Sequence, residues 1–189
     1  MPRRVPPPTV PIYQVKVTLK GSKPPIWRRL LVPSNTRLGK FHEMLQIVMG
    51  WTDSHLHQFI VGQTFYGTPD PDFGLEVRSE RTVLLSTVLR MPKDKIIYEY
   101  DFGDSWEHEV LLEKIVPPDP ETRYPVCLTG KRACPPEDCG GIWGYGGFLD
   151  AVASPTHPEH DSMLEWIGGE FNPEEFDLSE VNRVLTTLR

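Results

Sequence analysis

Residues 95–115, KIIYEYDFGDSWEHEVLLEKI, decide the fold, because they indicate two β-strands joined by a turn at residues 102–105. Apolar and aromatic side chains alternate with polar ones before the turn, and the alternation resumes after it. Such alternation is typical of strands with one buried face. Ile96, Tyr98 and Tyr100 should therefore lie on one side of the sheet, and the residues between them on the other.

A hairpin loop of two or four residues would pair positions whose numbers sum to 207. Asp101 would then face Trp106, and Glu99 would face His108. A carboxylate opposite a histidine can transfer protons or bind a metal, so Asp101, Asp104 and His108 are candidate catalytic residues. The alternative is structural: the aspartates hydrogen-bond the turn backbone, and Glu99 and His108 form an ordinary cross-strand pair.

The charge of the chain is unevenly distributed, with a formal net charge of -6. Residues 1–42 contain nine of the 20 lysines and arginines and no acidic residue, whereas the remainder carries all 26 acidic residues. This asymmetry could indicate nucleic-acid binding through residues 3–40. The alternative is that the basic segment packs against the acidic remainder of the same chain.

Length and composition favour one α+β domain. The 189 residues, 39% of them hydrophobic, can form one compact core over residues 11–189, after a proline-rich, disordered lead-in over residues 1–10. Within the domain we expect a sheet-rich core at 11–116 and a loop with helices at 117–189. The sequence shows no apolar run long enough for a membrane span. Three cysteines do not form a secreted disulfide framework, so we expect a cytoplasmic protein.

The first part of the domain predicts a hairpin followed by a helix. Alternation over residues 11–20 and 26–32 indicates two strands, and helical spacing over 38–49 indicates a helix that ends at Gly50. His42 lies off the apolar stripe of this helix, so we expect it at the surface. A hairpin-helix start favours a β-grasp-like fold with a mixed or antiparallel sheet.

His55 and His57 begin a third predicted strand, which extends to residue 61. Two histidines at i and i+2 project from the same side of a strand, so they could share one metal ion. Residues 62–81 are predicted to be an irregular connection, and residues 82–89 a short helical turn.

Residues 125–141 contain too much glycine and proline for regular structure, so we expect an ordered functional loop. Cys127, Cys134 and Cys139 could coordinate zinc, although their spacing is not that of paired zinc knuckles. Alternatively, Arg132 and the glycines could cradle an anion. A third interpretation is a rigid loop that packs onto the hairpin.

The C-terminal region predicts helices. Residues 143–152 and 157–167 have helical character, and Gly168 can end the second of these segments. The last helix is the most clearly marked, because Asp177 and Glu180 form a variant of the capping box ahead of an apolar stripe.

With these segments in place, the sequence resembles the plasmid pRiA4b open-reading-frame-three-like family, whose members also occur as passenger proteins of insertion elements. The resemblance covers roughly residues 11–187. It depends on YEYDFGDSWEHEV at 98–110, CLTGKRACPPEDCGG at 127–141 with GYGGF at 144–148, and HPEHDSMLEWIGGEFNPEEFDLSEVN at 157–182. It implies an α+β fold and an association with plasmids and mobile elements, and it assigns no catalytic residues.

Three functional hypotheses follow. The first is an accessory module that recognises an unknown protein or polyanion through the 101–108 turn and the 127–148 loop, with these binding residues: Tyr100, Trp106, Arg132, Glu137, Asp138, Trp143 and Tyr145. The second is a metal-dependent, hydrolase-like enzyme that uses Asp101, Asp104 and His108, with Cys134 and Cys139 as further ligands. The third is nucleic-acid binding by the basic hairpin. The first two require the turn and the loop to meet in one pocket.

Overall fold

The computed structural model describes residues 9–69 and 76–188, and it has the predicted α+β architecture. The strands are β1 (Ile12–Leu19), β2 (Trp27–Pro33), β3 (His57–Val61), β4 (Thr64–Gly67), β5 (Val77–Ser79), β6 (Lys95–Tyr100), β7 (Trp106–Val116) and β8 (Val126–Lys131). The helices are α1 (Leu38–Met49), α2 (Leu85–Val88), α3 (Gly141–Ala153), α4 (His160–Ile167) and α5 (Leu178–Leu185), with 3-10 turns η2 (Glu80–Thr82) and η3 (Thr186–Leu188).

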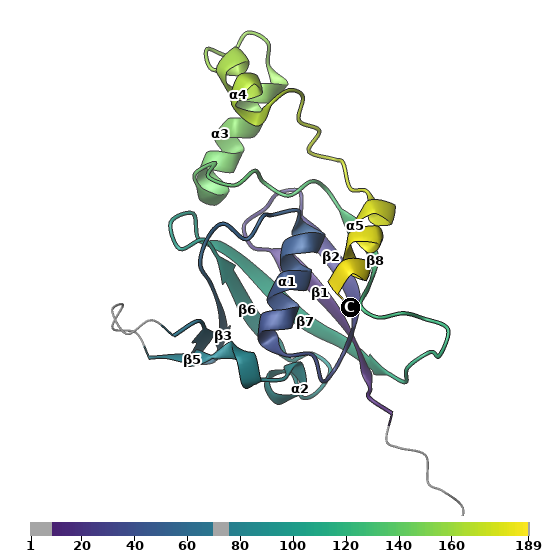
Figure 1. Cartoon of the computed structure of the whole chain (residues 1–189). Helices are drawn as coiled ribbons and strands as arrows, with labels where there is room; N and C mark the ends of the chain where they lie inside the picture. The colour runs from purple at the N-terminus through teal and green to yellow at the C-terminus, as the bar shows by residue number, and fades with distance from the viewer. Residues whose placement is uncertain (1–8, 70–75, 189) are drawn as a thin grey trace, which may run out of the picture.

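In the described part of the chain the strands form one mixed sheet, in the order β5-β4-β3-β6-β7-β1-β2-β8. The β4–β5 pair is parallel, and the other pairs are antiparallel. Helices α1 and α5 lie side by side across one face of the sheet (Figure 1). Val15, Val17 and Leu30 point toward this face and are fully buried with the apolar stripe of α1. Burial of this apolar surface is the main stabilising contribution to the fold.

The central hairpin of β6 and β7 is confirmed, but the predicted register is wrong by one residue. Tyr100 pairs with Trp106 and Tyr98 pairs with His108, so the partner numbers sum to 206. The reason is a five-residue loop over 101–105, in which Asp101 has a left-handed backbone with φ 57°. A shift of one residue exchanges the two faces of a strand. Trp106 and His108 therefore face the buried aromatic side of the hairpin.

The basic hairpin β1–β2 packs against the acidic strand β7 of the same chain. Arg29 Nε lies 2.7 Å from Glu113 Oε2, and Lys20 is paired with Glu107. Arg28 is buried and donates hydrogen bonds to the carbonyl oxygens of Val48, Lys131 and Arg132. These contacts give Lys20, Arg28 and Arg29 partners within the fold. Arg3 and Arg4 lie outside the described residues.

Two segments predicted to be irregular contain strands. Residues 62–81 form β4 and β5, although residues 70–75 lie outside the described part. Residues 125–141 begin with β8, which adds to the edge of the sheet beside β2. Gly130 allows this close packing, because a Cβ there would lie 2.8 Å from both Arg28 and the Phe176 ring. The glycine is therefore part of a strand and does not mark a loop.

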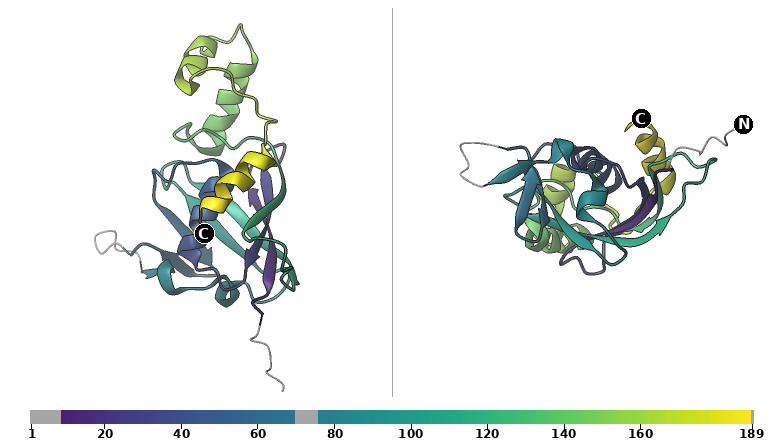
Figure 2. Two further views of the ribbon diagram at one scale, coloured as in Figure 1. Left: turned by 45° about the vertical axis from the view of Figure 1, so that its right-hand side comes forward. Right: turned by 90° about the horizontal axis from the view of Figure 1, so that it is seen from below.

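Helices α3 and α4 form a lobe that projects from one end of the sheet, and the chain then returns so that α5 packs beside α1 (Figures 1 and 2). The predicted cap of α5 is confirmed, because the Asp177 carboxylate accepts a hydrogen bond from the Glu180 amide. Within residues 9–69 and 76–188, no helix has both the length and the apolar character that a membrane span requires.

Candidate functional site

A polar cleft of about 570 Å³ opens between α1, the start of β3 and η2. Its lining includes three histidines and three acidic residues, which are His42, Glu43, Asp53, His55, His57 and Glu80. Three basic residues, Arg37, Lys40 and Arg81, line it as well. The cleft therefore combines groups that can bind a metal ion with groups that attract an anion.

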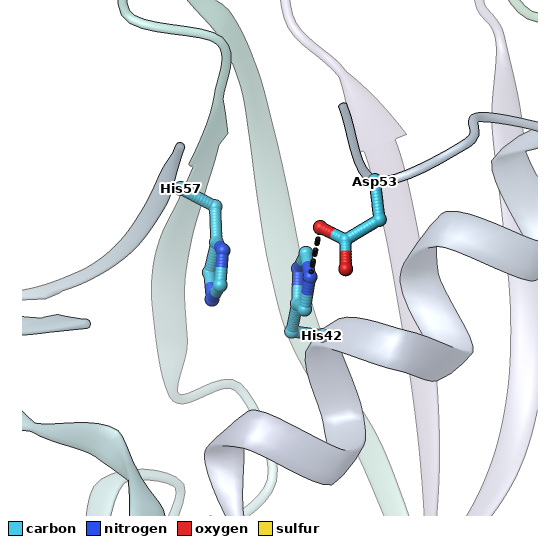
Figure 3. Close-up of side chains that lie close together, drawn as sticks. All are labelled: His42, Asp53 and His57. Carbon is cyan, nitrogen blue, oxygen red and sulfur yellow. Dashed lines mark hydrogen bonds and ion pairs between the residues drawn. The ribbon is translucent and has the colours of Figure 1, made fainter. Parts of the chain in front are cut away.

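Two histidines stack face to face in this cleft. His42 projects from α1 and His57 from β3, and their ring centroids lie 3.4 Å apart with an interplanar angle of 2° (Figure 3). Asp53 approaches His42 from the loop between these elements, and one ligand atom from each of the three residues falls within 4.8 Å of the others. We call His42, Asp53 and His57 the histidine cluster.

In each imidazole of the histidine cluster, one ring nitrogen lies within hydrogen-bond distance of a side chain outside the cluster. His42 Nδ1 lies 2.8 Å from the hydroxyl oxygen of Tyr98, which also accepts a hydrogen bond from Gln46 Nε2. His57 Nε2 lies 2.9 Å from Glu80 Oε2. His42 Nε2 is then the nitrogen that faces Asp53 Oδ1, at 2.8 Å, and His57 Nδ1 is left without a hydrogen bond among the described residues. Histidines that bind metals are commonly oriented in this way through their other nitrogen.

The histidine cluster is buried on one side and open on the other. His42 and Glu80 are buried, whereas 56% of the Asp53 side chain is exposed to the cleft. Burial is the largest cause that lowers the pKa of His42 below its ordinary value of 6.5, and the adjacent His57 lowers it further. The His42 imidazole is therefore neutral at neutral pH, which is the form that binds metals.

The local backbone explains how Asp53 reaches the cluster. Helix α1 ends at Gly50 with a left-handed φ of 93°, as the sequence predicted. Asp53 itself has φ 58°, a conformation that Asp tolerates better than most residues, and its amide donates to Gln46 Oε1 on α1. The turn after the helix therefore brings Asp53 back over His42.

The central hairpin and the cysteine-containing loop are in direct contact, whereas their meeting in one pocket stays a prediction. Asp104 Oδ2 accepts a hydrogen bond from the Gly140 amide at 3.1 Å, and the Tyr100 hydroxyl donates to Glu137 Oε1 at 2.5 Å. Asp101 Oδ1 accepts from the amides of Gly103 and Asp104. This last pair of bonds matches the structural interpretation of the turn aspartates.

The three candidate catalytic residues do not converge in the structure. Asp101 and Asp104 lie in the turn, whereas His108 is fully buried in the core, with its ring edge toward Trp51 at 5.2 Å. Burial lowers the pKa of His108 to about 4, so this residue is neutral at neutral pH. Their joint catalytic role is left without geometric support.

The cysteines do not gather into a metal site in the described part of the chain. Cys127 lies in β8, Cys134 is packed in the loop, and neither they nor Cys139 belong to a group of metal-ligating side chains. Burial raises the pKa of all three thiols, and it raises that of Cys139 to about 12. Because the three sulfur atoms do not gather around one point, the predicted cysteine site has no geometric support.

Several predicted binding residues have structural contacts. Tyr100, Trp106 and Tyr145 are buried, and Arg132 is buried with its guanidinium against Glu174 and the carbonyl oxygens of Pro24 and Pro173. By contrast, Trp143 is 91% exposed on α3. The exposed part of the predicted surface consists of Trp143 and Asp138, with Glu137 half-buried beside them.

His55 and His57 lie in two different groups of ligand atoms. Strand β3 begins at His57, so His55 lies in the preceding bend and joins Asp101 and Asp138. The sequence prediction of one shared ion is therefore not supported by the side-chain geometry.

Sequence reasoning also placed His42 at the surface, which is wrong, and it missed Asp53 and Glu80. The available signal was a polar flank on α1, where His42 and Gln46 lie one turn apart and both are buried.

Comparisons with known proteins identify the family. Residues 11–180 match the family described as Plasmid pRiA4b ORF-3-like protein. The chain is 38% identical over 179 residues to the "Uncharacterized protein y4hQ" of Sinorhizobium fredii (strain NBRC 101917 / NGR234), covering 94% of this chain and 92% of that protein. It is also similar to the crystal structure of a protein of unknown function, MM3350, from Methanosarcina mazei Go1, with a TM-score of 0.83 and 38% identity over 92% of this chain and 97% of the other. The chain belongs to the plasmid pRiA4b ORF-3-like family.

Proposed function

We propose that this member of the plasmid pRiA4b ORF-3-like family is a metal-dependent hydrolase whose ion is held by the histidine cluster. One observation carries the proposal: His42, Asp53 and His57 come from a helix, a loop and a strand, yet they present ligand atoms within 4.8 Å of one another in a polar cleft. Such convergence of two imidazoles and one carboxylate is unusual for side chains that only fill a core.

The donor set fits Zn²⁺ with an open position. Two histidines and one carboxylate are the protein ligands of many catalytic zinc sites, where a water occupies the remaining position. The same donors also suit Fe²⁺, so the metal identity is part of the test. A single ion cannot lie in the planes of two parallel rings. We therefore expect the His42 and His57 rings to rotate out of their 2° alignment when the ion binds.

The chemistry follows from the bound water. A Zn²⁺ ion held by His42, Asp53 and His57 would lower the pKa of a water molecule beside it and so would supply a nucleophile for hydrolysis. The water oxygen would bond to the electrophilic atom of the substrate, the bond to the leaving group would break, and the proton released by the water would pass to the leaving group. Glu80 acts as a positioning residue in this scheme, because its carboxylate holds His57 Nε2.

Basic residues in the cleft favour an anionic substrate. Arg37 and Arg81 are exposed, and neither has an ion-pair partner among the residues that the structure describes, whereas Lys40 is paired with Glu43. An arginine guanidinium binds phosphate oxygens through two parallel hydrogen bonds. We therefore propose a phosphoester or another phosphate-bearing compound as the substrate class.

Metal loading tests the first part of the proposal. The full chain would be dialysed against Zn²⁺ and then Fe²⁺ without chelator, and bound metal would be measured by elemental analysis. Asp53→Asn is a suitable variant, because Asn also tolerates the left-handed backbone at this position. We expect it to lose at least tenfold in affinity for the ion, whereas the exposed Asp150→Asn control on α3 keeps it. Equal affinity in both variants would overturn the assignment of the ligand.

Hydrolysis tests the second part. The metal-loaded protein would be assayed with p-nitrophenyl phosphate, bis(p-nitrophenyl) phosphate and the neutral ester p-nitrophenyl acetate. We expect turnover of a phosphate substrate that requires metal and is lost in Asp53→Asn, with a raised KM in Arg81→Ala. Metal-loaded protein with no turnover of any of the three would count against hydrolysis of esters, even if the ion binds.

A second candidate function is the accessory binding module, which one observation favours. Trp143 is a large aromatic side chain that is 91% exposed on the projecting lobe, and exposed aromatic residues are enriched at interaction sites. A Trp143→Ala variant should abolish binding to a partner found by crosslinking while leaving metal loading unchanged.

The cytoplasmic location remains part of this proposal, since three free cysteines suit a reducing compartment.

A further inference from the structure

We propose a second cation site, formed by His55, Asp101 and Asp138, which binds a divalent transition-metal ion and ties the 132–140 loop to the central hairpin. The three residues come from the bend before β3, the hairpin turn and the cysteine-containing loop, and their ligand atoms lie within 4.8 Å of one another. We call them the acidic cluster. This inference does not depend on the proposed hydrolase function.

The distances in the acidic cluster match the spacing of ligands around one ion. His55 Nε2 lies 3.1 Å from Asp138 Oδ1 and 3.7 Å from Asp101 Oδ2. Bonds of about 2.1 Å in a tetrahedral site place neighbouring ligand atoms about 3.4 Å apart. The two measured distances lie on either side of this value, so an ion could bind with small side-chain movements.

The His55 nitrogen is close to two carboxylates, but it is hydrogen-bonded to neither. His55 Nε2 is a buried atom, and it has no aligned hydrogen-bond partner in the described residues. An imidazole that pairs directly with a carboxylate, whether neutral or protonated, would direct an N–H at a carboxylate oxygen. The misalignment favours an ion placed between the three groups over a direct pair.

The two aspartates have oxygen atoms available for an ion. Asp101 uses Oδ1 for the amides of Gly103 and Asp104, which leaves Oδ2 on the side of His55. The Asp138 side chain is 70% exposed. An incoming ion can therefore reach the acidic cluster from solvent without breaking the hydrogen bonds of the turn.

Neighbouring residues hold the acidic cluster in place. Glu137 accepts hydrogen bonds from the Tyr100 hydroxyl and from Thr52. Tyr100 also accepts from the amides of Ser54 and His55. The hairpin, the bend and the loop are thus linked on both sides of the cluster, as expected for supports around metal ligands.

One imidazole and two carboxylates suit the hard ion Mn²⁺, which prefers oxygen ligands, and also the softer ion Zn²⁺. The histidine cluster has the opposite balance, with two imidazoles and one carboxylate. Mn²⁺ should therefore favour the acidic cluster, while Zn²⁺ should bind at both.

Metal titration of four variants of the full chain tests the site. Wild type should bind two Zn²⁺ ions, and Asp138→Asn and His42→Ala should each lose a different one of them. Asp138→Asn is the main variant, because this side chain is exposed and Asn tolerates its φ of 61°. The exposed Asp150→Asn substitution serves as the control and should bind as the wild type does.

Mn²⁺ binding, followed by loss of the free-ion electron paramagnetic resonance signal, should weaken at least tenfold in Asp138→Asn and His55→Ala and stay unchanged in His42→Ala. If the histidine cluster fails as a site, wild type still binds one ion, and Asp138→Asn alone removes it. If Asp138→Asn and His55→Ala bind Zn²⁺ and Mn²⁺ with wild-type affinity, the acidic cluster is not a cation site. His55 is then a histidine between two carboxylates.

Discussion

The histidine cluster and the acidic cluster each take one histidine from the same short segment, His57 and His55. They differ in whether the ring nitrogens of their histidines have hydrogen-bond partners. His57 begins a strand and is fixed by the ladder with β6, whereas His55 lies two residues earlier in a bend. In the histidine cluster, His42 Nδ1, His42 Nε2 and His57 Nε2 each have a partner between 2.8 and 2.9 Å away. In the acidic cluster the His55 nitrogen is aligned with no partner among the described residues.

This difference predicts two kinds of metal binding. An ion at the histidine cluster must displace a proton and reorient two stacked rings, so its binding should release protons and reshape the cleft. An ion at the acidic cluster enters a gap between groups that are already spaced for it, so its main effect should be on the loop that carries Asp138.

The largest expected effect distinguishes the clusters directly. His42→Ala should lower the Zn²⁺ affinity of the histidine cluster more than about 100-fold, because it removes a ligand and frees the Tyr98 hydroxyl. Competition with a chromophoric chelator measures this loss. The control is His157→Ala, which lies outside both clusters. An unchanged Zn²⁺ affinity in His42→Ala would show that the histidine cluster does not bind the ion.

His108 differs from the histidines of both clusters, because it is buried and has no carboxylate partner among the described residues. Burial lowers its pKa to about 4 in the folded protein, so the unfolded chain binds this proton more tightly between pH 6.5 and 4. The contribution of neutral His108 to the free energy of unfolding is therefore fully present above about pH 6.5. As the pH falls toward 4, the free energy of unfolding drops by about 3 kcal/mol. Urea unfolding at pH 7.5 and 4.5 should show a smaller loss of stability in His108→Gln than in wild type. Identical losses would show that His108 does not titrate in this way.

Glu80 tests whether orientation matters in the histidine cluster. Glu80→Gln keeps the shape of the side chain but removes the charge beside His57 Nε2. We expect Zn²⁺ affinity to fall about 10- to 100-fold, as for other groups that hold a ligand from behind. Calorimetric titration measures the change. Mn²⁺ binding at the acidic cluster should not change in this variant, and a parallel loss there would mean that the two clusters are one unit.

The smallest expected effect concerns the contact between the loop and the turn. A Cβ on Gly141 would lie 2.5 Å from the Asp104 carbonyl oxygen, and the φ of Gly141 is +68°. Gly141→Ala should therefore lower the free energy of unfolding by about 1–2 kcal/mol. It should also lower the affinity of the acidic cluster for its ion, because the loop must move. Gly146→Ala, with nothing within 4 Å of its added Cβ, is the matched control and should not destabilise the protein. Equal urea midpoints and equal Mn²⁺ affinity in the two variants would show that this contact is unimportant.

Sequence patterns predicted the elements whose signals are local. The alternation around the central hairpin, the helical spacing before Gly50 and the Asp177 cap all reflect neighbours along the chain, and all three are present. The hairpin register was missed because it depends on left-handed backbone at Asp101 and Ser105. Loop conformations of this kind are not determined by alternation alone.

The site was harder to predict than the fold, because its residues meet through long-range packing. His42 is buried only because β3 and β6 bring His57 and Tyr98 against α1. Glu80 reaches His57 across 23 positions of sequence. The contact between the hairpin turn and the cysteine-containing loop could be predicted from their dense polar chemistry, but the ligand atoms within it could not.

Anomalous diffraction at the zinc edge tests the central claim most directly. Crystals of the full chain grown with Zn²⁺ should show an anomalous peak between His42 Nε2, His57 Nδ1 and the Asp53 carboxylate, with the two imidazole rings rotated out of their parallel stack. Absence of a peak at this position at saturating Zn²⁺, with the rings still 3.4 Å apart and parallel, would contradict the account.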